Sequence, residues 1–261
     1  MVLGKRKRGA SGPTRRVRRR TVPKAVKRYV KSAIHRNIEN KEIVRRVINQ
    51  ALVTGLSGSV SPYTYSFLPD IPEGAEFGER VGNQVTPRMC SIKAQINLLP
   101  YQSSTNPFAP IMVRIWVVSY KLQNRNTVTL NLNDFDRFFE DGNDSIGFQG
   151  NMLDMMMPVN KHDWTVHTER KFKLGVSSNN TGSTYSNNTT APDNGSFARS
   201  INLNVSKKLR AKLKYDDGSV TRPTNRNMYM VVQAVRMDGG TGTALTSCEI
   251  HFSHRFVFED A

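Results

Sequence analysis

Short apolar runs separated by turn-forming residues recur from residue 60 to the end of the chain. Met89–Leu99 alternates, with its apolar side chains at positions 92, 94, 96 and 98 on one face. Ile111–Leu122 is apolar on both faces, as expected for a central strand that is covered on both sides. Further strands are predicted at Trp164–Leu174, Ser200–Val205, Leu209–Tyr215, Tyr229–Arg236 and Cys248–Phe258.

Helical patterns are scarce in the same region. Asn133–Glu140 is predicted as one short helix, with Asn133 or Asp134 as its cap. No long helical pattern is available for parallel crossovers, so the sheets are predicted to be antiparallel and the fold all-β, a sandwich or a jelly roll. Residues 175–197 are polar and predict an exposed loop, whereas the glycines at 239, 240 and 242 predict a hairpin turn.

Residues 42–53 fit two structures. The apolar positions have helical spacing, but the β-branched content and the Gly-Ser-rich segment that follows are typical of a strand. We interpret this segment as a strand.

The first 38 residues have a different character. Glycines at 4, 9 and 12 and Pro13 interrupt a segment without apolar periodicity, which predicts that residues 1–20 are disordered when free. Pro23 is typical of a first helical turn, and apolar residues then recur every four positions at 26, 30, 34 and 38. This spacing predicts a helix over residues 22–38.

Charge divides the chain at the same place. Met1–Arg36 contains fourteen Lys or Arg and no Asp or Glu, whereas residues 51–261 carry 21 basic and 19 acidic side chains. A run of like charge repels itself and needs a polyanion, so nucleic acid is the expected partner. The sequence thus predicts a basic arm, residues 1–38, and one domain, residues 39–261, whose near-neutral composition predicts no matching basic surface. The predicted nucleic-acid-binding residues are Lys5, Arg6, Lys7, Arg8, Arg15, Arg16, Arg18, Arg19, Arg20, Lys24, Lys27, Arg28 and Lys31.

The two densest basic runs, Lys5–Arg8 and Arg15–Arg20, also have the form of a bipartite nuclear-import signal. A nuclear-import receptor of the host is therefore a second expected partner. The sequence shows no apolar signal segment at its start and no run of the ~18 apolar residues that a membrane span needs, so membrane insertion is not expected.

The sequence offers no convincing catalytic set, and we expect neither an enzyme nor a cofactor. His167 and Glu169 would share one face of a strand and could form a hydrogen bond, whereas His251 and His254 would lie on opposite faces, which is poor metal geometry. The two cysteines, at positions 90 and 248, lack metal-ligand spacing and are interpreted as buried thiols. One acidic cluster is either a solvated loop or a divalent-cation site at a subunit contact; it comprises Asp134, Asp136, Glu140, Asp141 and Asp144.

One stretch carries a family resemblance. Leu68–Val85 reads LPDIPEGAEFGERVGNQV and is similar to the "I-P-x-G … R-x-G-x-x-(I/V)" segment that opens the jelly roll in capsid proteins of small circular single-stranded-DNA viruses, the circovirus- and geminivirus-like groups. Glu39–Lys41 resembles the "E-x-K" at the entry to the first strand of that family, and the order of the later segments is similar. The matching positions are Ile71, Pro72, Gly74, Arg80, Gly82 and Val85.

The resemblance implies a single eight-stranded antiparallel jelly roll of the viral coat type with a disordered basic arm. It further implies self-assembly into a small icosahedral shell of about 60 copies, with the arm inside on the single-stranded DNA genome. The protein would then belong to the virion and, during assembly, to the host nucleus. Two alternatives remain: a coat protein of a small RNA virus, because phosphates of DNA and RNA look alike to Lys and Arg, and a non-viral basic-tailed nucleic-acid-binding protein.

Overall fold

The computed structural model divides the chain into two compact units, Met1–Ile38 and Glu39–Ala261. In the first unit, residues 24–29 are helical and follow Pro23, whose carbonyl accepts a hydrogen bond from the Lys27 amide at 3.1 Å. The rest of the predicted helix and the predicted disordered segment 1–20 lie outside the described residues. The structure describes residues 23–29, 40–54, 62–99, 110–122, 130, 135–142, 144–175, 197–209, 211–216, 221–237 and 245–260.

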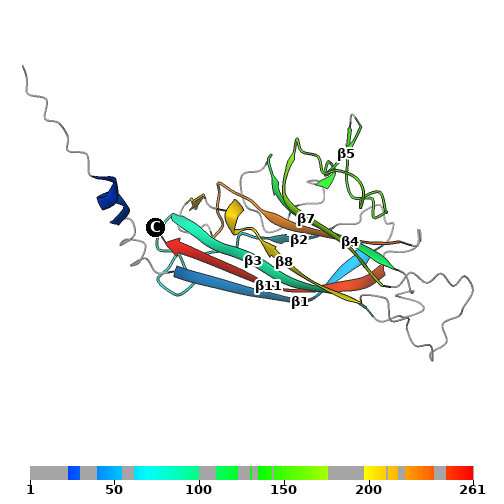
Figure 1. Ribbon diagram of the computed structural model, residues 1–261, viewed down its shortest axis with the longest axis horizontal. Helices are drawn as coiled ribbons and strands as arrows, with labels where there is room; N and C mark the ends of the chain where they lie inside the picture. Colours follow the sequence, from blue (N-terminus) through cyan, green and yellow to red (C-terminus); the bar gives the residue numbers. More distant parts are fainter. Residues whose placement is uncertain are drawn as a thin grey trace, which may run out of the picture. The chain divides into compact units, whose positions relative to one another are not determined.

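The second unit is built from two antiparallel sheets that pack face to face (Figure 1). One sheet has the order β1-β11-β3-β8, and the two-residue strand β9 extends it beside β3; the other has the order β2-β10-β4-β7. The four strands β1, β11, β3 and β8 of one sheet and the four strands of the other, with chain neighbours β1 and β2 in different sheets, form an eight-stranded jelly roll. The predicted fold class is therefore confirmed. The strands of the first sheet are β1 (Asn40–Thr54), β11 (Leu245–Asp260), β3 (Gln84–Leu98), β8 (Ala198–Asn204) and β9 (Leu213–Lys214). Those of the second are β2 (Tyr63–Ser66), β10 (Tyr229–Arg236), β4 (Ile111–Tyr120) and β7 (Trp164–Leu174).

The main core fills the space between the two sheets. Alternation along β3 turns Ile92, Ala94 and Ile96 inward, where they meet the inward side chains of the second sheet, among them Val113 and Val232. The outer positions of β3, such as Lys93, remain exposed. The period-2 pattern of the sequence thus determines which face of the first sheet meets solvent.

A second core covers the outer face of the second sheet, and its apolar residues come from β4, β7, β10 and the segment 130–163. Trp116 and Val118 of β4 point into it, while Val113 and Val117 point into the main core. This arrangement confirms that β4 is covered on both faces. The covering segment carries the hairpin of β5 (Phe139–Asp141) and β6 (Asp144–Ile146).

The predicted helix at 133–140 is wrong in its described part. The Phe138 amide donates to the Phe135 carbonyl at 3.1 Å in a tight turn, and Phe139 then enters β5 opposite Ile146. The physical reason is aromatic packing: this turn places all three phenylalanines in the second core, with Trp116 centred 5.4 Å from Phe138 and 5.9 Å from Phe139.

Other strand predictions match the structure closely. Residues 42–53 lie within β1, and β7 and β10 have the predicted bounds. The strand predicted at Leu209–Tyr215 is reduced to β9, because the Asn225 side chain binds the Lys212 carbonyl at 3.0 Å and the Lys214 amide at 2.9 Å in place of a neighbouring strand. Most of the predicted loop 175–197 lies outside the described residues.

Candidate functional site: the arm and the surfaces of the sandwich

The described part of the basic arm presents its charge on one side. Lys24, Lys27 and Arg28 are exposed, and their i, i+3 and i+4 spacing places them on one face of the helical turn. The remaining predicted binding residues lie outside the described residues: Lys5, Arg6, Lys7, Arg8, Arg15, Arg16, Arg18, Arg19, Arg20 and Lys31.

The sandwich begins at a well-anchored point, which we call the arm root: Asn40 and Lys41 at the start of β1, the loop 71–83 and the end of β11. Lys41 is buried, and its Nζ donates to the Glu79 carbonyl at 2.6 Å and to Asp260 Oδ2 at 3.2 Å. The same Asp260 oxygen accepts the Val81 amide at 2.6 Å. One lysine therefore ties the first strand to the loop and to the last strand.

The loop of the arm root contains the residues of the family motif and brings them together. The Arg80 amide donates to the Pro72 carbonyl, and the Gly74 amide donates to the Arg80 carbonyl, each at 2.9 Å. Ile71 and Val85 belong to the main core. Gly74 packs tightly, because an added Cβ would lie 1.9 Å from Glu79 Oε2. These residues shape the loop.

Arg80 is fully buried at the centre of that loop. Its Nη1 donates to the Gly82 carbonyl at 2.8 Å and to Asn83 Oδ1 at 3.1 Å, and lies 3.5 Å from Glu73 Oε2. The guanidinium carbon lies 4.6 Å from the centroid of the Tyr215 ring, a cation–π contact. Arg80 therefore stabilises the loop from inside the sandwich.

Three arginines next to the arm root are paired with carboxylates, Arg255 with Glu42, and Arg45 and Arg222 with Asp70. Arg255 binds Glu42 with two bonds, of 2.6 and 3.0 Å, and this hydrogen bonding lowers the pKa of Glu42. Burial acts to raise the pKa of Asp70, but contacts with Arg222 and Arg45 outweigh it and lower that pKa. These three cations of the sandwich are thus compensated next to the arm root.

A buried histidine lies between the sheets, next to a cysteine. His254 is fully buried, with Nδ1 3.1 Å from the Tyr65 hydroxyl and Nε2 3.6 Å from Cys90 Sγ. Burial raises the pKa of Cys90, and burial followed by the Arg45 charge lowers the pKa of His254 to about 4. An activated thiolate–imidazolium pair needs the opposite shifts. This pair is therefore part of the core.

The histidines of β7 and β11 have structural hydrogen bonds or lie on opposite faces of their strand. His167 and Glu169, for which the sequence left a shared hydrogen bond possible, have other partners. The β4–β7 register shifts between Val117 and Val118, and His167 Nε2 meets Ser119 Oγ at 2.8 Å. Glu169 instead accepts from Arg114 Nε at 2.8 Å. His251 lies on the outer face and His254 on the inner face of β11, as predicted.

Metal-binding geometry is not seen in the described part of the chain, where no group of three or more His, Cys, Asp or Glu side chains could hold a metal ion. Of the predicted acidic cluster, Asp134 lies outside the described residues, and Asp141 and Asp144 face each other at the exposed end of the β5–β6 hairpin. Nor does any helix among the described residues have the length and apolarity to cross a membrane.

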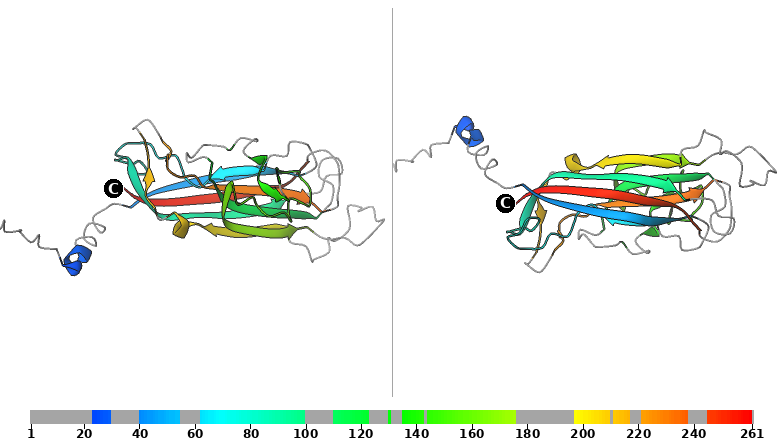
Figure 2. Two further views of the ribbon diagram at one scale, coloured as in Figure 1. Left: turned by 90° about the horizontal axis from the view of Figure 1, so that it is seen from above. Right: turned by 90° about the horizontal axis from the view of Figure 1, so that it is seen from below.

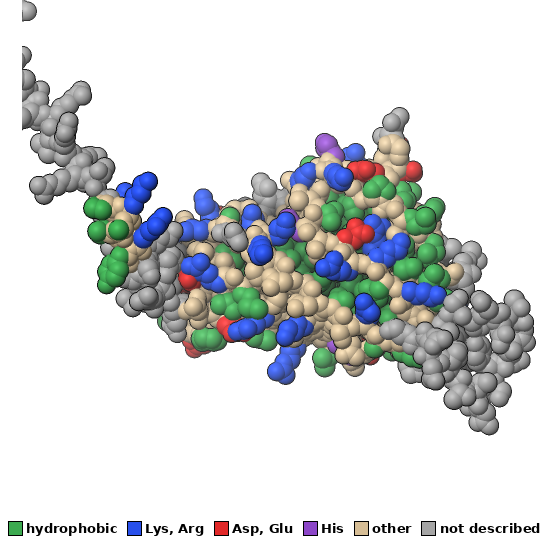
Figure 3. Space-filling model, in the orientation of Figure 1, with side chains coloured by type: hydrophobic (Ala, Val, Ile, Leu, Met, Phe, Trp, Pro, Cys, Tyr) green, Lys and Arg blue, Asp and Glu red, His purple; other side chains and the backbone are tan. Residues whose placement is uncertain are grey.

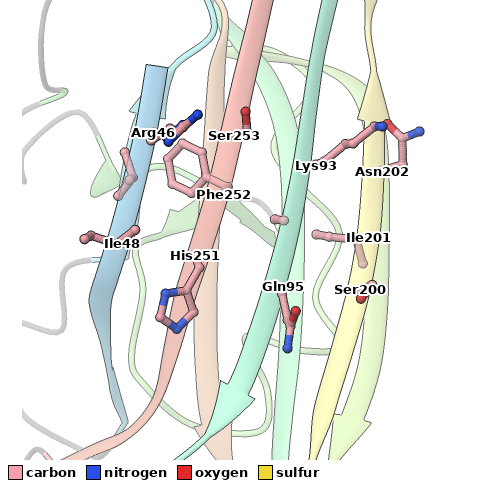
Figure 4. A pocket seen from close by; sticks show the side chains of 12 residues that line it. Arg46, Ile48, Lys93, Gln95, Ser200, Ile201, Asn202, His251, Phe252 and Ser253 are labelled. Atoms are coloured by element: carbon pink, nitrogen blue, oxygen red, sulfur yellow. The ribbon is translucent and has the colours of Figure 1, made fainter. Parts of the chain in front are cut away.

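A shallow groove of about 630 Å³ crosses the outer face of the first sheet (Figure 4). Its rim includes Arg46, Lys93 and Gln95, and Ile48 stands 74% exposed on the edge strand β1. His251, which also lines it, is engaged through Nε2 with Glu249 at 2.8 Å and through Nδ1 with the Asn49 amide at 3.2 Å. The groove offers contact surface and holds no nucleophile–base pair.

The edge strands β7 and β8 lie on the same side of the sandwich (Figure 2) and make that side basic. Figure 3 shows Lys and Arg side chains spread over one face of the molecule with few carboxylates between them. This distribution corrects the expectation of a domain without a basic surface, since charges that balance in composition are separated in space. The exposed cations of β7, β8 and the following turn are Arg170, Lys171, Lys173, Arg199, Lys207 and Lys208.

Comparisons with known proteins add little at the level of sequence. No family model and no curated protein matches the chain. Among solved structures, it is similar to a chain from Desmodium yellow mottle tymovirus, with 10% identity and a TM-score of 0.32 over 100% of this chain and 94% of that chain. It is also similar to VP1 of Trichodysplasia spinulosa-associated polyomavirus, solved in complex with 6'-sialyllactose, with 11% identity and a TM-score of 0.28 over 85% of this chain and 94% of that chain. The assignment of the fold rests on the strand order of the sandwich itself.

Proposed function

We propose that this protein is a viral capsid protein that self-assembles into a small icosahedral shell and packages a single-stranded DNA genome through its N-terminal arm. The observation that carries the proposal is the joining of two parts in one chain: an eight-stranded jelly roll and, shortly before β1, the segment Met1–Arg36 with fourteen cations and no carboxylate. The jelly roll is the architecture of many viral shells.

Charge supports packaging by the arm. In a shell of about 60 copies, arms with fourteen cations each would neutralise on the order of 800 phosphates. Contacts of Lys and Arg with phosphate position a nucleic acid without reading its sequence. Such an arm suits the enclosure of a whole genome better than the recognition of one site.

The sandwich also offers several separate contact surfaces, as a shell subunit with different neighbours requires. Phe77 and Val81 are 71% and 67% exposed in the loop of the arm root. Leu153 and Met156 are 60% and 71% exposed in the segment that covers the second sheet. Burial of these side chains against neighbouring copies would add apolar contact area that the isolated subunit leaves in water.

The basic runs Lys5–Arg8 and Arg15–Arg20 would serve the protein twice, first for nuclear import through a host receptor and then for packaging. Replacing the Lys and Arg of both runs by alanine is expected to abolish nuclear entry and packaged nucleic acid together. Nuclear entry of the alanine variant would overturn the import half of this proposal without affecting the packaging half.

The genome type is tested by the contents of purified particles. After external nuclease treatment, nucleic acid is extracted and digested separately with DNase and RNase. We expect single-stranded DNA. Protected RNA would instead support an RNA-virus coat protein, and empty shells from infected or co-expressing cells would contradict packaging by the arm.

A further inference from the structure

A polar pocket of about 210 Å³ opens where β4 ends and β7 begins. Ser119 and His167 form part of its floor, and Lys208 and Arg226 approach from the segments that follow β8 and precede β10. Thr165 adds a further hydroxyl to the lining. The pocket is distant in sequence from the basic arm and contains none of the residues of the family motif.

The floor of the pocket is fixed by a hydrogen-bond chain. The side chain of Asn227 binds the Tyr120 backbone in both directions, at 2.8 Å to the amide and 2.9 Å to the carbonyl. Ser119 Oγ donates its only proton to the Asn227 carbonyl at 2.7 Å, so at 2.8 Å it must accept a hydrogen bond from His167 Nε2. His167 therefore carries its proton on Nε2, and Nδ1 of the neutral ring holds a lone pair.

The charges around this floor have one sign. Arg226 Nη1 donates to the Lys208 carbonyl at 3.0 Å, which holds the guanidinium at the rim of the pocket. Burial and then the charges of Lys208 and Arg226 lower the pKa of His167. Within the described part of the chain, no ion pair joins either cation to a carboxylate, and no Asp or Glu lines the pocket. Two cations and a half-buried imidazole therefore face a cavity without a compensating anion.

We propose that this pocket binds a tetrahedral oxyanion, the phosphate or sulfate group of a ligand, between Lys208 and Arg226. The cavity has the volume of about seven water molecules, enough for such a group together with a few waters. Arg and Lys together supply the charge-assisted donors that phosphate and sulfate favour. A bound dianion would also favour a proton on His167 Nδ1, which adds a third positive group facing the cavity from β7.

The test uses the full chain and follows thermal unfolding in sodium sulfate against sodium chloride at equal ionic strength. At a sulfate concentration ten times Kd, the Tm is expected to rise by about 3–5 °C. The double variant Lys208→Gln/Arg226→Gln should lose this rise. The control Lys93→Gln/Arg199→Gln, which removes the same charge from the first sheet, should keep it, and an equal rise in both double variants would overturn the site.

A second readout concerns pH, and it needs no double variant. Sulfate stays dianionic between pH 7.5 and pH 5.5, so tighter binding at the lower pH reports a proton gained by the protein. We expect this tightening in the wild type and its loss in His167→Gln. Lys208→Gln alone, at an exposed side chain, should weaken sulfate binding without loss of folding. Unchanged pH dependence in His167→Gln together with unchanged affinity in Lys208→Gln would reject the proposal.

Two probes distinguish the possible sources of the bound anion. Dimethyl phosphate represents the diester of a nucleic-acid backbone, and inorganic phosphate represents a free or terminal phosphate. Stabilisation by either probe that is lost in Lys208→Gln/Arg226→Gln supports the site and identifies its ligand class, whereas no response to either probe contradicts it. Shell formation by the double variant is scored separately in electron micrographs, so failure of this inference is distinguishable from failure of the capsid proposal.

Discussion

Acid is expected to destabilise the subunit through His254, the histidine buried between the two sheets. Its imidazole is enclosed by Tyr65, Phe67 and Phe256, with ring centroids 5.5, 6.0 and 6.4 Å away. Burial, followed by the Arg45 charge, lowers its pKa from the ordinary 6.5 to about 4 in the folded protein. The folded state therefore prefers the neutral ring, whereas the unfolded state takes up a proton near pH 6.5.

The sign and size follow from linkage. Above pH 6.5 the ring is neutral in both states, so its burial does not make the free energy of unfolding depend on pH. As pH falls from 6.5 to 4, the unfolded state gains a proton that the folded state resists, so stability falls by about 2 kcal/mol at pH 5 and roughly 3 kcal/mol at pH 4. Below pH 4 both states bind the proton and the loss levels off.

The assay is urea unfolding of the wild type and His254→Gln between pH 7.5 and pH 3.5, on subunits kept dissociated by low concentration. The pKa values of Glu42 and Asp70 are also lowered in the folded protein and contribute to its sensitivity to acid, but these groups are common to both proteins and cancel in the difference. The wild type should lose about 2 kcal/mol more than the variant between pH 7.5 and pH 5. Parallel pH profiles for the two proteins would refute the argument that His254 is buried in its neutral form.

Three further outcomes are expected. Arg80→Ala should cost about 3 kcal/mol of unfolding free energy, because it removes a buried cation with its hydrogen bonds. Arg255→Ala, which removes an exposed ion pair with Glu42, should cost only a small fraction of that. Chemical denaturation compares the two variants, and equal costs would contradict the supporting role of Arg80. Trp116→Ala should lower the free energy of unfolding by about 4 kcal/mol, because it leaves a cavity in the second core. Phe77→Ala should change it very little, since the Phe77 ring is 71% exposed. A small loss for Trp116→Ala would show that the covering segment does not close this core. The affinity for a labelled oligothymidylate should fall with salt, and the slope of log affinity against log salt concentration should be about −10 for the fourteen cations of Met1–Arg36. When alanines replace the nine cations of the two basic runs, the slope should be about −3.5. Equal slopes for the two proteins would exclude the arm as the binding element.

The sequence predicts those parts of the fold that depend on local periodicity. β7 and β10 have their predicted bounds, and β4 is covered on both faces, because a continuous apolar run has no polar side to present to water. β2 was not predicted, because its four residues, Tyr63–Ser66, are too short a run to stand out, although Tyr63 and Tyr65 alternate onto the main core. Local pattern carries less information where a strand is short.

Long-range features could not be predicted in the same way. The glycines near 239–242 predict a hairpin, yet the flanking strands lie in different sheets, with β10 beside β2 and β4 and β11 beside β1 and β3. A turn signal shows that the chain reverses and does not show which strand it meets afterwards. The shift in register at Val117–Val118 is equally invisible in sequence, and it decides that His167 contacts Ser119.

The candidate sites also differ in whether they depend on local sequence or on long-range folding. A run of like charge identifies the arm from sequence alone, because its charge does not depend on folding. Lys208 and Arg226 are separated in the chain from each other and from His167, and they form no motif; the jelly roll brings them to one pocket. The basic side of the sandwich is hidden for the same reason, since composition averages over faces that folding separates.

Negative-stain electron microscopy of the purified full-length protein tests the proposed function most directly. At high protein concentration and moderate salt, with nucleic acid present, the chain should form closed particles of uniform diameter. Particles should fail to retain nucleic acid when alanines replace the cations of Lys5–Arg8 and Arg15–Arg20. A protein that stays monomeric under all of these conditions would contradict its assignment as a capsid subunit.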